Sequence, residues 1–336
     1  MATRWNCVTI FFTPVAGGPV HRTPRPPNST PPASHNRQAG DAGQNVAVVN
    51  SSVRTANRDG LTFDVHELGP PSGDPVLLLH GFPQRGDSWH AVATRLADSG
   101  FRTLAPDQRG YSPRARPAGR GAYRLGEMAD DALVVVDQLV GPAARVHLVG
   151  HDWGAAVAWR LAARHGERIR SLTAVSVPPP AAYLRSLFTT RQGLASWYVY
   201  AFQLPWLPER LLAAKGGPFS RRFVAALRRT GQSKESAQRD AAGLADPAAL
   251  TAAINWYRGM FSTPPGESDP PVRVPTLFVW SDGDTALTRQ STELARRYVA
   301  GPFRYAELRG VSHWIPDEAP DQLAELILDH IGEHPA

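Results

Sequence analysis

An aspartate stands at the centre of a sharp turn between a predicted strand and a predicted helix. The pentapeptide Gly150-His-Asp-Trp-Gly154 follows the apolar run 146–149 and precedes the helix-like stretch 155–159. A nucleophile flanked by small residues at such a turn is the sequence form of a nucleophile elbow, whose glycines permit strained backbone and close helix approach. Most elbows carry serine, whereas this chain carries Asp152. A carboxylate that attacks an sp3 carbon leaves an ester, which a second step can cleave. The pattern therefore predicts Asp152 as a nucleophile.

Turnover of such an ester needs a base and a carboxylate that orients the base. Two later predicted strands, 276–280 and 303–308, end in an Asp-Gly-Asp sequence and a Ser-His-Trp sequence. The carboxyl ends of parallel strands meet at one edge of a sheet, where such folds hold their sites. We predict His313 as the base and Asp284 as its partner, with Asp282 as the alternative acid. Taken singly, such residues are more often caps, turns or core residues, but their order and placement favour catalysis.

A third turn offers backbone amides to the same site. The segment His80-Gly-Phe-Pro83 follows the predicted buried strand 76–79. We predict that the N–H groups of Phe82 and Trp153 form an oxyanion hole for the ester of Asp152. One such donor is worth about 3 kcal/mol of barrier. The Phe82–Pro83 pair also predicts a rigid turn, which can hold a cis bond.

Around these residues the 336-residue chain alternates strand and helix patterns. We predict strands over 46–54, 61–68, 76–79, 102–105, 146–149, 172–177, 276–280 and 303–308, and helices over 89–99, 127–140, 154–165 and 320–331. This alternation predicts an α/β fold with a mostly parallel sheet flanked by helices, opened by an antiparallel pair around Asp59-Gly60.

The strand pattern stops between two proline clusters, 178–180 and 270–271. The intervening residues are rich in Trp, Tyr and Leu at helical spacing. We predict a helical cap over 179–271, inserted between the core segments 50–178 and 272–336 and lying over the elbow. Residues 1–49 are rich in Pro, Ser, Asn and Gly, which predicts a disordered extension without assigned function.

The net charge of +6 gives little support to nucleic-acid binding. Residues 1–50 hold four arginines against one aspartate, so half of the excess lies in the predicted extension. The remaining globule is weakly charged. The arginines at 221, 222, 228 and 229 have the spacing of a solvated helix face. We expect no nucleic-acid partner.

Several further classes of site are disfavoured. No apolar run reaches membrane-spanning length, so we expect no membrane partner. Cys7 is the only cysteine, which excludes an intramolecular disulfide and a cysteine-based metal site and favours a cytoplasmic setting. No ligand cluster or phosphate loop stands out, and we expect no metal or organic cofactor.

From about residue 50 to 336 the chain resembles the α/β-hydrolase superfamily, and specifically its epoxide hydrolase branch. The matching segments are His80-Gly-Phe-Pro83, Asp107-Gln-Arg-Gly-Tyr-Ser112, Gly150-His-Asp-Trp-Gly154, Trp280-Ser-Asp-Gly-Asp284 and Gly310-Val-Ser-His-Trp314. The resemblance implies hydrolysis of a small-molecule epoxide to a vicinal diol through an alkyl ester of Asp152. Most of the segments also occur in haloalkane and haloacid dehalogenases, so they indicate an aspartate nucleophile more strongly than a substrate.

Opening an epoxide expels an alkoxide, which needs an acid. The resemblance implies two cap tyrosines in this role and assigns it to Tyr198 and Tyr257, with Tyr200 as the alternative to Tyr198. A tyrosine is neutral at pH 7 and still holds the proton that the alkoxide takes. The side chains expected to contact substrate are Phe82, Trp153, Tyr200, Trp256 and Trp314.

The main alternative is a haloalkane or haloacid dehalogenase with the same Asp-His-Asp triad and a halogenated substrate. Fluoroacetate dehalogenases carry arginine after the nucleophile, where this chain has Trp153, and haloalkane dehalogenases usually carry asparagine where it has Phe82. A remote alternative is a non-catalytic ligand-binding relative, although such relatives usually lose a triad member. No serine occupies an elbow, which excludes a serine esterase.

Overall fold

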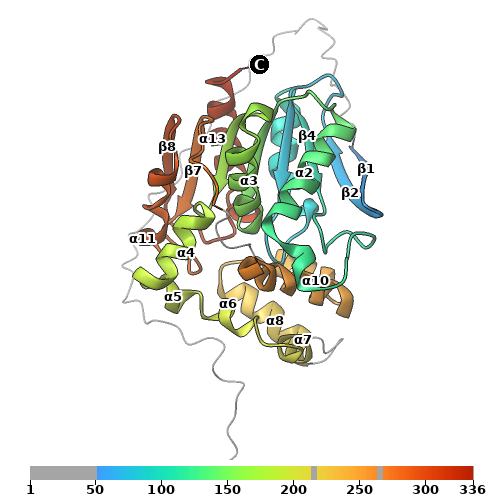
Figure 1. The fold of residues 1–336 in the computed structure, drawn as a ribbon, viewed down its shortest axis with the longest axis vertical. Coiled ribbons are helices and arrows are strands. Elements are labelled where there is room, and N and C mark those ends of the chain that lie inside the picture. Colours follow the sequence, from blue (N-terminus) through green and yellow to red (C-terminus); the bar gives the residue numbers. More distant parts are fainter. Residues whose placement is uncertain (1–50, 213–217, 263–267, 336) are drawn as a thin grey trace, which may run out of the picture. The chain divides into compact units, whose positions relative to one another are not determined.

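A computed structural model describes residues 51–212, 218–262 and 268–335 of the chain (Figure 1). These residues form an eight-stranded sheet with the order β1-β2-β4-β3-β5-β6-β7-β8. The strands are β1 Ser51–Arg58, β2 Leu61–Leu68, β3 Pro75–Leu79, β4 Arg102–Pro106, β5 Val146–His151, β6 Ile169–Val175, β7 Thr276–Ser281 and β8 Phe303–Leu308. Strand β2 pairs antiparallel with β1 and with β4, and all other pairs are parallel. The predicted α/β class and the opening antiparallel pair are confirmed.

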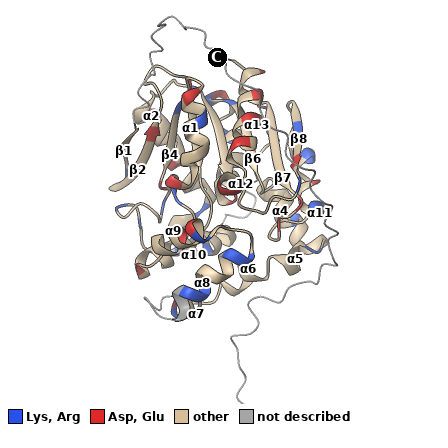
Figure 2. Cartoon of the chain, turned by 180° about the vertical axis from the view of Figure 1, so that it is seen from behind, with Lys and Arg blue, Asp and Glu red and all other residues tan. Residues whose placement is uncertain are grey.

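Helices cover both faces of the sheet. One face carries α2 (Leu125–Leu139) and α3 (Trp153–Arg164), in front of the sheet in Figure 1. The opposite face carries α1 (His90–Asp98) and α13 (Pro320–Gly332), which come forward in Figure 2, with the short α12 (Ile315–Glu318) beside them. This layering explains why the central strands are apolar on both sides.

Strand β3 shows the two-sided burial residue by residue. Leu77 and Leu79 join the hydrophobic cluster under α2 and α3, whereas Val76 and Leu78 join the cluster under α1 and α13. Successive side chains of a strand point to opposite faces, so a continuous apolar run fills both cores. Full burial of one such side chain contributes about 1.5–3 kcal/mol. The rigid sheet that results positions the turns at its carboxyl edge.

A helical insertion lies between β6 and β7, as predicted. Its helices are α4 Pro180–Thr189, α5 Gln192–Ala195, α6 Trp197–Ala201, α7 Leu207–Leu212, α8 Pro218–Arg229, α9 Lys234–Gly243 and α10 Pro247–Gly259, followed by η5 Met260–Ser262. Helix α10 begins with proline at its first position, and the Asp246 carboxylate caps it by accepting from the amide of Ala248 at 3.1 Å. Figure 1 shows the insertion gathered at one end of the sheet.

Two predicted strands differ most from the structure. Strand β6 begins at Ile169 and ends at Val175, so the predicted range 172–177 was placed too late. The strand cannot continue because Ser176 has a φ of 68°, which turns the chain away from the sheet. Strand β1 runs on to Arg58 rather than ending at residue 54, while its predicted start at 46 and the predicted extension 1–49 lie outside the described residues.

Charged residues of both signs are spread over the described elements in Figure 2. All four arginines of the predicted solvated face lie on α8 and are exposed. None of the helices in the described ranges is both long enough and apolar enough to cross a membrane.

Candidate active site

Asp152 sits between the end of β5 and the first turn of α3 with a φ of 52° and a ψ of −120°. Such a conformation costs on the order of 1–3 kcal/mol and persists only where its surroundings enforce it. The flanking glycines are needed, because a Cβ on Gly150 would overlap the carbonyl of Gly154, and one on Gly154 would overlap that of Leu79. The structure thus holds the carboxylate of Asp152 out from a sharp strand-to-helix turn.

Two backbone amides approach that carboxylate. Phe82 donates its N–H to Oδ1 of Asp152 at 2.8 Å, and the amide of Trp153 also lowers the pKa of Asp152 through a hydrogen bond. The loop can come this close because Gly81 has no side chain: a Cβ there would overlap the carboxylate. The Phe82–Pro83 peptide bond is cis. The two amides expected from the sequence therefore lie at the carboxylate of Asp152.

His313 lies between two carboxylates. Its Nδ1 is 2.7 Å from Oδ2 of Asp284, and its Nε2 is 3.6 Å from Oδ2 of Asp152. The carboxylate of Asp284 is fully buried, and its Oδ1 accepts the amides of Ala286 and Leu287 at 2.7 and 2.9 Å. The structure thus brings Asp284, and not Asp282, to the imidazole.

The alternative acid, Asp282, has a different role. It is exposed, and its Oδ1 accepts the amide of Gly310 at 2.7 Å. That bond ties the loop after β7 to the loop after β8. Asp282 thus supports the loop that carries the histidine.

The two flanking carboxylates decide the protonation of His313. Burial alone would lower the pKa of His313, but the charges and hydrogen bonds of Asp284 and Asp152 raise it to about 10. In return, burial would raise the pKa of Asp152, but its bond to His313 and the charge of that ring hold it below its usual value. At neutral pH the site holds an imidazolium between two carboxylates.

A buried chain of hydrogen bonds supports the histidine loop. His151 Nε2 lies 2.9 Å from the carbonyl oxygen of His313, and its Nδ1 lies 3.0 Å from Oε1 of Gln84. Gln84 donates its amide to Asp317 at 2.8 Å, and Arg239 on α9 makes two hydrogen bonds to the same carboxylate, each of 3.0 Å. Burial and the adjacent charge of His313 lower the pKa of His151 to about 4, so its neutral ring donates to only one of the two oxygens of His313 and Gln84. Because Gln84 and Arg239 are distant from His313 in sequence, the sequence patterns did not reveal this support.

Two tyrosines of the insertion contact each other near Asp152. The rings of Tyr198 and Tyr257 are 5.9 Å apart and nearly perpendicular, and the ring of Tyr257 lies 5.1 Å from that of Trp153. Burial, together with the charge of Asp152, raises the pKa of both phenols well above 10. Both tyrosines therefore keep their protons at neutral pH, and both lie close enough to Asp152 for its charge to raise their pKa.

Side chains between α6 and α10 fix the spacing of this pair. Gln203 donates its amide to the carbonyl oxygen of Val199 at 3.1 Å and to that of Tyr257 at 2.9 Å. Arg258 donates to the carbonyl oxygen of Phe202 at 2.9 Å. These cross-links join the two tyrosine-bearing helices, and sequence reasoning did not identify them.

The other residues predicted to contact substrate differ in their exposure and packing. Tyr200 is 42% exposed, whereas Tyr198 is half-buried, which favours Tyr198 as the inward-facing residue of the two. Trp256 is fully buried behind Trp153 and donates its indole N–H to the carbonyl oxygen of Arg109 at 2.7 Å, so it packs the core. Trp314 packs its ring against His313, with ring centroids 5.2 Å apart.

One aromatic residue at the site was missed by the sequence analysis. Tyr183 on α4 donates its hydroxyl to Ser196 at 2.8 Å, and burial raises its pKa, with a further contribution from the charge of Asp152. It also lies close enough to Tyr198 to affect the pKa of that phenol. The only sequence signal was its position just after the proline cluster 178–180.

The chain is similar to several known proteins. Residues 74–320 match the family described as "alpha/beta hydrolase fold". The chain is 31% identical to epoxide hydrolase A of Mycobacterium tuberculosis over 83% of this chain and 96% of that protein. It is 33% identical to the AB hydrolase superfamily protein YfhM of Bacillus subtilis over 82% and 96% of the two chains. The crystal structure of epoxide hydrolase VrEH1 from Vigna radiata superposes with a TM-score of 0.71 at 26% identity, covering 84% of this chain and 98% of that one.

Proposed function

Because the chain belongs to the α/β-hydrolase family, in its epoxide hydrolase branch, we propose that it hydrolyses small-molecule epoxides to vicinal diols. The relatives support the substrate class. The observation that carries the mechanism is the asymmetry of the Asp152 carboxylate: the Phe82 amide binds Oδ1, while Oδ2 faces His313. One oxygen is held as a future carbonyl, and the other is available to attack.

In the first step Oδ2 of Asp152 attacks a ring carbon of the epoxide and the carbon–oxygen bond of the ring breaks. The ring oxygen leaves as an alkoxide, which is a poor leaving group unless it gains a proton. Tyr198 and Tyr257 hold that oxygen, and one of them supplies the proton. Because their pKa values are raised, both phenols stay protonated until the alkoxide forms. The product of this step is an alkyl ester of Asp152.

Formation of the ester changes the environment of His313. The negative charge of Asp152 helps to raise the pKa of His313 in the free enzyme, and that charge disappears when the carboxylate is alkylated. The pKa of His313 therefore falls, and the proton that it releases restores the tyrosine hydroxyl. The neutral imidazole then serves as a general base, with Asp284 ready to stabilise it when it is protonated again.

In the second step His313 removes a proton from water, and the oxygen attacks the ester carbonyl carbon of Asp152. Negative charge develops on Oδ1, where the amides of Phe82 and Trp153 stabilise it. One such donor contributes about 3 kcal/mol. When this intermediate collapses, the bond between the carbonyl carbon of Asp152 and the product oxygen breaks. The product oxygen takes the proton of the new carboxyl group, so that the diol leaves, the carboxylate is regenerated and His313 is again protonated. Side chains of this chain thus transfer each proton, the two backbone amides donate only hydrogen bonds, and the substrate is a small molecule.

A single turnover in heavy-oxygen water, with enzyme in excess over styrene oxide, tests this route. We expect the first diol to be unlabelled and the peptide that contains Asp152 to gain label, read by mass spectrometry. The His313→Gln variant should accumulate a protein adduct with the added mass of the epoxide. Label in the first diol, with none in the protein, would show direct hydration and exclude the ester. Halide release from bromoalkanes without diol formation from styrene oxide would instead favour the dehalogenase alternative.

A further inference from the structure

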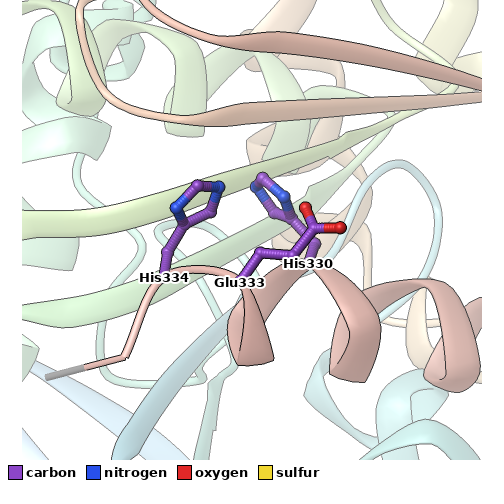
Figure 3. Close-up of side chains that lie close together, drawn as sticks. All are labelled: His330, Glu333 and His334. Carbon is purple, nitrogen blue, oxygen red and sulfur yellow. The ribbon is translucent and has the colours of Figure 1, made fainter.

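Three side chains able to bind a metal converge at the carboxyl-terminal end of α13. His330, Glu333 and His334 each offer a ligand atom, and these atoms lie within 4.8 Å of one another. The two imidazole rings are 5.0 Å apart and nearly perpendicular, and Figure 3 shows both rings and the carboxylate on the same side of this last turn. His330 lies in the last turn of α13, Glu333 in the turn that follows the helix and His334 in the bend after it.

His330 is the unusual member of this cluster. Only 2% of its surface is exposed, yet neither ring nitrogen has a hydrogen-bond partner. The carbonyl oxygen of Pro275 lies beside the ring and accepts the amide of Leu172, but its geometry toward His330 is not that of a hydrogen bond. Buried polar groups are nearly always satisfied, so an unpaired imidazole that faces two further ligands points to a missing partner.

A neutral imidazole binds a metal ion through the lone pair of one ring nitrogen, while the other nitrogen keeps its hydrogen. One ring nitrogen of His330 can therefore serve as a ligand, and Glu333 and His334 offer the two others.

We propose that His330, Glu333 and His334 form a binding site for one divalent transition-metal ion of the Zn²⁺ type, with water as the fourth ligand. Two imidazoles and one carboxylate are a ligand set that Zn²⁺ accepts. Ligand bonds of about 2.0–2.2 Å require the three groups to draw together. The two outer ligands are free to do so, because Glu333 is exposed with a loose 3.7 Å contact to Arg304 and His334 lies in the bend after the helix.

The position of this cluster indicates a structural role. Pro275 precedes β7 and His147 is the second residue of β5, so the cluster lies near the amino ends of the parallel strands. Asp152 and His313 lie at the carboxyl ends, and Figure 1 shows the end of α13 on the side away from the insertion. A bound ion would hold the last turn of α13 to the residues that follow it and would not take part in the reaction at Asp152.

The site is tested on the full chain, stripped with a chelator and titrated with Zn²⁺ against a chromogenic competitor, with the thermal unfolding midpoint as a second readout. We expect one tight site per chain and a midpoint that rises with Zn²⁺. His334→Ala and Glu333→Gln should each weaken Zn²⁺ binding at least tenfold without loss of folding. His165→Ala, which removes a partly exposed histidine beside Glu167, is the matched control and should bind as the unaltered protein does.

His330→Asn removes the buried ligand and should also abolish binding, although its effect on folding makes the two surface variants the deciding ones. Affinity within twofold of the unaltered protein in both His334→Ala and Glu333→Gln would overturn the proposal. Epoxide hydrolysis should be the same before and after chelation. A loss of activity that Zn²⁺ restores would overturn the structural role.

Discussion

The amide of Phe82 donates a hydrogen bond to Oδ1 of Asp152 at 2.8 Å. The donor proposed to stabilise the second transition state therefore already orients the nucleophile in the first. The bond leaves Oδ2 on the side of His313, at 3.6 Å from Nε2. A preorganised donor needs no rearrangement when charge develops, which is the physical basis of electrostatic stabilisation.

Gly81→Ala tests this close approach. A methyl group at Gly81 would overlap Cβ and Oδ1 of Asp152 and must displace either the loop or the carboxylate. We expect diol formation to fall about 10²- to 10³-fold, the effect of losing an oxyanion donor, while circular dichroism stays unchanged. The control is Gly121→Ala, where a Cβ would contact nothing. Full activity in Gly81→Ala would show that the amide of Phe82 contributes little.

The variants Tyr198→Phe and Tyr257→Phe test whether these two tyrosines act as acids in ring opening. Each hydroxyl holds or protonates the leaving oxygen, so we expect each single variant to lower kcat for styrene oxide by about 10²-fold or more. Any halide displacement should be much less affected, because a halide leaves without a proton. Tyr200→Phe, at the exposed neighbouring position, is the control and should retain activity. Equal losses with epoxide and halide substrates would contradict the acid role.

The variants Asp284→Asn and Asp282→Asn test which of the two aspartates after β7 is the acid of the triad. Asp284→Asn removes the charge beside Nδ1 of His313, so base catalysis of the second step should fall by about 10²- to 10⁴-fold and the ester should accumulate. Asp282→Asn loosens only a loop hydrogen bond and should keep most activity. Quenched-flow mass spectrometry of the adduct measures both. A larger loss in Asp282→Asn would reverse the assignment.

The raised pKa of His313 predicts how stability depends on pH. The folded protein holds this proton up to a pKa of about 10, whereas the unfolded chain releases it near its ordinary value of 6.5. Between these values the folded state binds more protons, so the contribution of His313 to stability is complete below pH 6.5 and is lost as the pH rises toward 10.

Urea unfolding at pH 6.5 and pH 9.5 measures this loss. In Asp152→Asn one of the two charges that raise the pKa of His313 is removed. We expect the decrease in unfolding free energy between the two pH values to be smaller in that variant. An identical decrease in both proteins would show that His313 is not protonated between the two carboxylates.

Much of this protein could be predicted from residue patterns. The parallel α/β sheet, the helical insertion and the family follow from alternating apolar runs and a few turn segments, and the structure and the comparisons confirm them. The elbow could be recognised in the sequence because glycines are required where two backbone segments nearly touch, and these glycines are visible in the sequence. The roles of Asp152, His313 and the tyrosines stay predictions.

Choices between near neighbours were decided only by tertiary structure. Asp282 and Asp284 are two residues apart, and only the path of the loop directs one carboxylate to His313 and the other to a backbone amide. Tyr198 and Tyr200 share a helix, and packing against Tyr257 on α10 determines which of them is less exposed. Such outcomes depend on contacts between segments distant in sequence.

The same limit applies to the cluster on α13. The spacing of His330, Glu333 and His334 is visible in the sequence, but that spacing alone is common on exposed helices. Burial of His330 without a hydrogen-bond partner arises from the packing of α13 against the sheet. The sequence by itself determined which groups the chain carries and on which elements they lie. The tertiary structure decided which of them meet, because burial and long-range contacts set their charge, partners and orientation.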